Sequence, residues 1–168
     1  MDVHEILADG YGRLPETIEN AVRDLAPEQL RWAPKPGANS IGWLIWHLTR
    51  VQDHHITGIV GGEQIYVTGD WGPRFGLKTD PSDTGYGHTA AQAAAVAPES
   101  DQALIDYYEA VHDRTVEALE SLTPADLDRI VDRDWDPPVT VGVRLVSILD
   151  DDIQHAGQAA YLRGLISG

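Results

Sequence analysis

The chain has 168 residues, close to the ~150 typical of one domain and enough to bury a full hydrophobic core. Twelve Lys and Arg against 27 Asp and Glu give a formal net charge of −15, which argues against partners such as nucleic acids or anionic membranes. The absence of cysteine excludes disulfides, thiolate metal sites, iron–sulfur clusters and a cysteine nucleophile. No apolar run approaches the ~18 residues of a membrane span, and the first residues are acidic and polar. We therefore expect a soluble, cytoplasmic protein with a single domain over residues 1–168.

The spacing of apolar residues predicts four long helices. Apolar residues recur at steps of three and four over about 2–25, 40–60, 100–122 and 140–165. Pro15 is expected to kink or divide the first helix, and Ser40 is a suitable N-cap for the second. The fourth helix is apolar on most of its circumference, which predicts that it is the central and most buried one.

A long irregular stretch, roughly 61–98, separates the second and third predicted helices. It is rich in Gly, Pro, Thr and Asp and too long for an ordinary connection, so we interpret it as a crossover that helps form a site. Residues 90–96 within it are expected to form one or two helical turns. Similar proline-containing turns at 25–30 and 122–127 follow the first and third helices, although chance explains this equally well. The prediction is an all-α, four-helix bundle with a long crossover between the second and third helices.

Histidines and aspartates on two of these helices suggest a metal site. With seven histidines and no cysteine, such a site must use imidazole and carboxylate ligands. His47 and His54 share one edge of the second helix, but they are ~10.5 Å apart along its axis and only one of them can bind a given ion. Asp151 and His155 form an i,i+4 pair on a largely apolar face of the fourth helix, where a buried carboxylate needs a compensating cation. Asp152 is the competing carboxylate, and a solvated aspartate patch beside an ordinary histidine is the alternative, because this spacing alone is weak evidence.

Three stretches of the chain carry a resemblance to a known family. They are Ser40–Leu48 (SIGWLIWHL), 154–164 (QHAGQAAYLRG) and 84–89 (TGYGHT). Together they resemble the DinB-like superfamily, in particular the actinobacterial branch related to mycothiol-dependent maleylpyruvate isomerases. The fold of that family is a four-helix bundle with a long crossover, which agrees with the periodicity.

The resemblance implies a specific set of metal ligands. In the family, one histidine of the second helix and an H-x-x-x-H or E-x-x-x-H pair of the fourth hold the metal. Carried over to this chain, the ligands are His47, Asp151 and His155. Asp151 departs from the usual His or Glu, and its shorter reach makes it the weakest member of the set. Two imidazoles and a carboxylate suit Zn²⁺, Ni²⁺ or Fe²⁺.

The resemblance also implies an activity. Three protein ligands leave an open coordination position, which is typical of a catalytic site. A thiol at that position would ionise near neutral pH, and because the chain has no cysteine the thiol must come from a low-molecular-weight cosubstrate. We therefore expect a mycothiol-, bacillithiol- or similar thiol-dependent transferase or isomerase acting on a small electrophile.

Three other functions stay open. Water at the same position would instead give a metal-dependent hydrolase. A non-catalytic metal-binding or stress-response protein could use the same fold. A metal-free interaction module could use residues 79–113, which carry seven acidic side chains and no Lys or Arg.

Several further residues have two interpretations. Trp43 and Trp46 lie away from the apolar stripe of their helix, so they could line a pocket or form a dimer contact; we favour the contact and expect a homodimer. Tyr86 and His88 in the glycine-rich crossover could approach the open metal position or have no role. His55 falls inside the apolar stripe and is expected to be a packed imidazole with a hydrogen-bonded neighbour.

Overall fold

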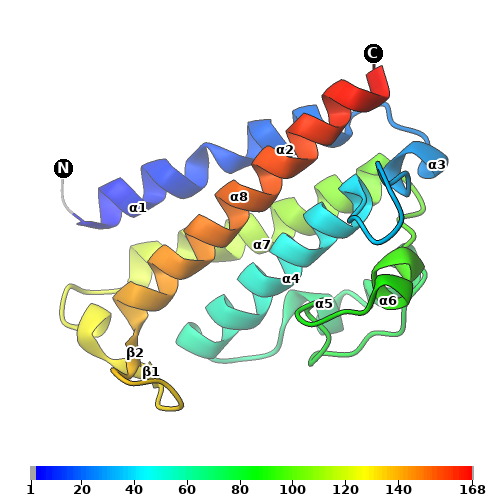
Figure 1. Cartoon of the computed structure of the whole chain (residues 1–168). Coiled ribbons are helices and arrows are strands. Elements are labelled where there is room, and N and C mark those ends of the chain that lie inside the picture. The colour runs from blue at the N-terminus through cyan, green and yellow to red at the C-terminus, as the bar shows by residue number, and fades with distance from the viewer. Residues whose placement is uncertain (1–2, 168) are drawn as a thin grey trace.

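Four long helical segments pack side by side in a computed structural model of the chain, which describes residues 3–167 (Figure 1). The segments are α1 (Val3–Gly12) with α2 (Leu14–Val22), α4 (Ile41–Val60), α7 (Asp101–Ser121) and α8 (Val141–Ser167). α1, α2 and α8 run in one direction and α4 and α7 in the other (Figure 1). α7 and α8 each pack against both α2 and α4. The structure thus confirms the predicted all-α bundle with a long crossover between the helices now labelled α4 and α7.

The predicted helix limits agree closely with those observed. Ser40 caps α4, because its hydroxyl accepts a hydrogen bond from the Trp43 N–H at 3.1 Å. The first predicted helix is divided at Arg13, as expected from Pro15. That proline lies in the first turn of α2, where its missing N–H leaves no helical hydrogen bond unmade.

Short elements occupy the connections. They are α3 (Pro27–Leu30), α5 (Ile65–Thr68), η1 (Gly72–Phe75), α6 (Ala90–Ala95), η2 (Asp126–Asp128), β1 (Ile130–Asp132) and β2 (Val139–Thr140). α6 is the helical segment expected within the crossover. The antiparallel β1–β2 pair was not predicted, and its second strand leads directly into α8. No helix within residues 3–167 is both long enough and apolar enough to cross a bilayer.

The most buried helix is α4, so the prediction that the fourth helix would be central is wrong. Apolar side chains from all four segments form the core. On the outer face of α8, however, Val143, Val146, Ile153 and Tyr161 are each more than half exposed. The reason is the crossover: it covers the side of α4 that the other helices leave open, whereas nothing in the described chain covers this face of α8.

The two tryptophans of α4 are also buried, contrary to their expected exposure. Trp43 is 6% exposed and Trp46 is fully buried. Periodicity placed them away from the bundle, but the crossover packs over them, with Gly85 approaching both rings. They cannot form a surface contact with a second chain, and the expected homodimer stays a prediction without their support.

A buried polar network holds the crossover against α4 and α7. The side chains of Arg50 and Asp53 form an ion pair at 3.3 Å and are both fully buried. Asp53 also accepts hydrogen bonds from the backbone N–H groups of the first two residues of α5 and from the Tyr107 hydroxyl. The Arg50 guanidinium donates to five acceptors: Asp53, the Tyr107 hydroxyl, the Gln64 amide oxygen and the backbone carbonyls of Pro81 and Asp83. Asp53 therefore holds the start of α5, and Arg50 holds residues 81–83, which lead directly to Thr84.

Candidate metal centre

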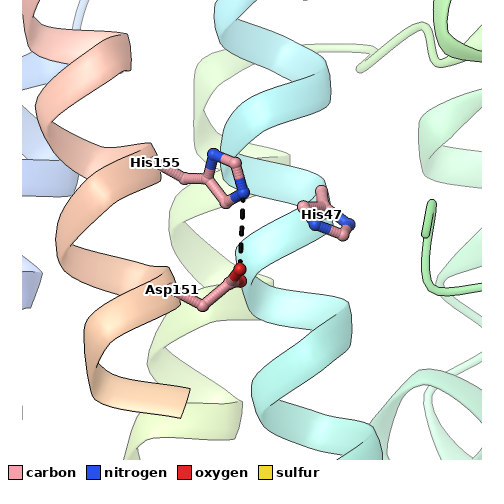
Figure 2. A group of neighbouring side chains, drawn as sticks. All are labelled: His47, Asp151 and His155. Carbon is pink, nitrogen blue, oxygen red and sulfur yellow. Dashed lines mark ion pairs between the residues drawn. The ribbon is translucent and has the colours of Figure 1, made fainter. Parts of the chain in front are cut away.

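The three side chains predicted to bind a metal lie together where α4 meets α8 (Figure 2). His47 comes from α4, and Asp151 and His155 come from successive turns of α8. Each contributes a potential ligand atom, and these atoms all lie within 4.8 Å of one another. His155 Nε2 is 3.5 Å from Asp151 Oδ1, and the rings of His47 and His155 meet edge to face with centroids 5.0 Å apart. Within the described chain, this is the one group of three such side chains.

Hydrogen bonds from the other ring nitrogens set the tautomers of both histidines. His47 Nδ1 lies 2.5 Å from the Thr84 carbonyl oxygen, and His155 Nδ1 lies 2.9 Å from the Gln158 amide oxygen. Both oxygens only accept hydrogen bonds, so each Nδ1 carries the proton and donates. Each neutral ring therefore keeps the Nε2 lone pair for a ligand, which is the arrangement that metal-binding histidines require.

Asp151 supplies a direct sign that a cation fits here. Its Oδ2 atom is buried and has no hydrogen-bond partner. A buried carboxylate oxygen without a donor is costly, and a metal ion beside it would remove that cost. The donor set, the tautomers and this orphaned oxygen all fit a divalent ion.

Asp152, the competing carboxylate, is not part of the group. It is fully buried on the side of α8 that faces Tyr11 and Tyr108, whose phenol pKa values are raised by burial and then by this carboxyl. Burial, followed by the charge of Asp151, raises the pKa of Asp152 well above its usual range. The neutral form of Asp152 is therefore favoured, and Asp151 is the carboxylate that faces His47 and His155.

The two histidines differ in their affinity for protons. Burial lowers the pKa of His47, whereas the hydrogen bond with Asp151 raises the pKa of His155. A metal ion at this position would take over the role of the His155 proton as the partner of Asp151, so binding is expected to release protons.

The crossover covers the outer side of His47 by a close backbone approach at Gly85. This residue has φ +86°, and a Cβ added to it would lie 2.8 Å from Trp46 and 2.9 Å from His47 Nδ1. Only glycine allows the chain both this conformation and this contact. Gly85 therefore lets the carbonyl of Thr84 reach His47.

Substitution of Gly85 with alanine should destabilise the protein more than the same change at Gly87. Gly87 also has a positive φ, +75°, but nothing lies within 4 Å of an added Cβ. The left-handed backbone should lower the free energy of unfolding of both variants by about 1 kcal/mol. Gly85→Ala should lower it by a further ~1–3 kcal/mol, because the added Cβ forces the loop to move. Urea denaturation of the two variants checks this; equal losses would show that the contact with Trp46 and His47 contributes nothing.

His88 anchors the crossover and does not approach the metal position. Its Nδ1 accepts a hydrogen bond from Trp43 Nε1 at 3.2 Å, and its Nε2 donates to Asp83 at 2.9 Å. The ring also stacks on Trp46 with centroids 5.7 Å apart. Because both nitrogens have partners, neither earlier interpretation of His88 is correct: it is neither a candidate ligand nor a residue without a role. Tyr86, which is 91% exposed, stands at the mouth of the adjoining cavity.

A cavity of about 220 Å³ opens beside His47, Asp151 and His155, which together are called the triad. His47 and Asp151 lie in its wall together with apolar side chains, Val51 and Ile148, and with the cationic Arg144. Its volume is below the ~300–1,000 Å³ of drug-sized sites, so it suits a small molecule or one end of a larger one. A second cavity, of about 200 Å³, shares Arg144 and His55 with the first.

His55 should make the metal-free protein sensitive to mild acid. Burial, followed by the charges of Arg144 and His54, lowers its pKa to about 4, while Asp132 and Asp151 act in the opposite direction. Between pH 6.5 and 4, His55 binds a proton in the unfolded state but stays neutral in the folded state. Its contribution to the free energy of unfolding should therefore fall by ~2–3 kcal/mol as the pH falls through this range. In chelator-treated protein, His55→Gln should remove this part of the slope; an unchanged slope would contradict the assignment.

Comparison with known proteins identifies the family. The model of the DinB superfamily matches residues 11–159, a range that contains all three side chains of the triad. The chain belongs to the DinB superfamily.

Two solved structures are similar to this chain over nearly all of its length. A conserved protein from Enterococcus faecalis is 31% identical, with a TM-score of 0.91 over 100% of this chain and 99% of the other. A DinB-like protein from Bacillus cereus is 22% identical and shares the fold, with a TM-score of 0.64 over 97% and 92% of the two chains. No match was found among curated proteins.

Proposed function

We propose that this DinB-superfamily protein binds a divalent metal ion through His47, Asp151 and His155 and uses a low-molecular-weight thiol to transform a small electrophile. The observation that carries the proposal is the buried Asp151 oxygen without a partner, in a carboxylate group that lies within 4.8 Å of two imidazole nitrogens and beside a cavity. Zn²⁺, Ni²⁺ and Fe²⁺ all suit these ligands. When bound, the ion would lower the pKa of a thiol at its open position.

The residues of the chain have distinct parts in this reaction. Thr84 and Gln158 hold the two imidazole rings in the tautomers that expose Nε2. Val51 and Ile148 form the apolar wall of the cavity, which limits the access of water to the reacting atoms. Because the chain lacks cysteine, both the sulfur and the electrophile enter as small molecules. The thiolate sulfur then forms a bond to the electrophilic carbon, and either a leaving group departs with the electron pair or the adduct rearranges.

The likeness to the mycothiol-dependent branch makes mycothiol the first thiol to test, followed by bacillithiol and glutathione. The Zn²⁺-loaded protein should accelerate loss of 1-chloro-2,4-dinitrobenzene with one of these thiols, and His155→Ala should abolish the acceleration. Acceleration that persists in His155→Ala would refute the role of the triad. Tight metal binding without turnover across a broad panel of thiols and electrophiles would instead favour a non-catalytic metal-binding protein.

A further inference from the structure

Arg144 places a positive charge in the wall of the cavity beside the triad. Among the described residues that line this cavity it is the one Lys or Arg, and its side chain is 17% exposed. The guanidinium donates to the Asp132 carboxylate at 2.7 Å, and within residues 3–167 this is its one hydrogen bond. A guanidinium has five N–H donors in a planar fork, so most of the donors of Arg144 are left for a ligand.

The position of Arg144 along α8 sets the length of that ligand. Arg144 precedes Asp151 by seven residues, or ~10.5 Å along the helix axis. Val51 and Ile148 also line the cavity and make part of its wall apolar. A molecule that reached both the guanidinium and the triad would therefore combine an anionic end with an apolar middle.

We infer that Arg144 anchors a carboxylate group of the molecule that reacts at the triad. This inference rests on the proposed function for the reacting end, but the anion site itself needs no metal. A planar carboxylate matches the free edge of a guanidinium. A dianionic phosphate would meet stronger repulsion from Asp132, which already neutralises part of the Arg144 charge. The carboxylate can belong to the electrophile or to the thiol cosubstrate.

A purely structural role for Arg144 is the competing explanation, because its pair with Asp132 joins α8 to β1. The two roles predict opposite effects of Asp132→Asn. If the pair only joins two elements, removing either partner should weaken anion binding at the cavity to the same extent. If Arg144 binds an anion, Asp132→Asn keeps the guanidinium charge, frees a further donor and strengthens anion binding.

The first test uses metal-free protein, so that it is independent of the proposed metal site. Butanoate is titrated while the arginine Nε–H resonances are followed by NMR, with butanamide as the uncharged probe. The Arg144 resonance should shift in a saturable way with butanoate alone, and Arg144→Gln should weaken binding about tenfold or more. Asp132→Asn should bind as tightly or more tightly. Arg163→Gln is the matched control, since Arg163 is on the same helix but donates to the backbone carbonyl of Arg23.

The second test identifies which reactant carries the carboxylate. Cobalt-loaded protein is titrated with 6-mercaptohexanoate and with 6-mercaptohexanol, and the sulfur-to-cobalt absorption band reports thiol binding. If Arg144→Gln weakens only the mercaptohexanoate, the thiol cosubstrate carries the carboxylate; if both thiols bind equally while butanoate binding still depends on Arg144, the electrophile carries it. The inference is overturned if butanoate binding does not depend on Arg144, or if Asp132→Asn weakens it as much as Arg144→Gln does. Failure of cobalt to bind would refute the proposed metal site but leave the butanoate result intact.

Discussion

Replacement of Arg50 with methionine is expected to lower the free energy of unfolding by about 3–5 kcal/mol. The substitution would leave the fully buried carboxylate of Asp53 without its cation. It would also remove donors from the Gln64 amide oxygen and from the backbone carbonyls of Pro81 and Asp83. The loss should extend to the site, because the released segment leads directly to the Thr84 carbonyl that orients His47.

A matched control separates burial from charge. Arg13 forms an i,i+4 pair with Asp9, but the two side chains are 76% and 55% exposed. Arg13→Met should therefore change stability by no more than about 0.5 kcal/mol. Urea denaturation of the two variants measures the difference. If Arg50→Met cost no more than Arg13→Met, the buried pair could not be what holds the crossover in place.

Substitution of Asp151 with asparagine is expected to abolish tight binding of divalent metal. The change removes the negative charge and leaves one weakly basic oxygen beside His47 and His155. The loss of affinity should exceed the ~10–100-fold typical of removing an outer contact, and Gln158→Ala, which frees His155 Nδ1, should fall within that smaller range. Competition for Zn²⁺ against a chelating dye measures each variant.

The neighbouring carboxyl is the control for that experiment. Asp152→Asn changes a residue of the same type at the next position of α8, but Asp152 is buried away from the group, and burial raises its pKa. It should retain the affinity of the unaltered protein. If Asp152→Asn lost metal while Asp151→Asn kept it, the choice of carboxylate would be wrong.

Local patterns predicted much of this structure. Helical periodicity located the long helices, and Ser40 and Pro15 correctly predicted a cap and a break, because these signals depend on neighbouring residues along the chain. The i,i+4 spacing brought Asp151 and His155 together for the same reason. The partner on α4 was reached through the family motif, since spacing alone left His47 and His54 as alternatives.

Features that depend on the crossover could not be predicted. Trp43 and Trp46 were expected at the surface, and α8 was expected at the centre, because periodicity does not show which helix face a distant segment will cover. The structural role of His88 likewise depends on contacts with α4. The pair of Arg50 and Asp53 was not singled out either: the i,i+3 spacing lets the two side chains meet on one helix face, but it is the crossover covering this face that buries them. Arg144, in the first turns of the apolar fourth helix, was likewise not singled out.

The metal content of the purified protein tests the central claim most directly. Elemental analysis should find about one equivalent of Zn²⁺, Ni²⁺ or Fe²⁺ per chain, or the protein should take up one equivalent when the ion is added. Chelation should remove the ion and lower the midpoint of thermal unfolding, since a ligand that binds only the folded state stabilises it. A protein that contains no divalent metal, acquires none on addition and unfolds at the same temperature with and without chelator would contradict the account.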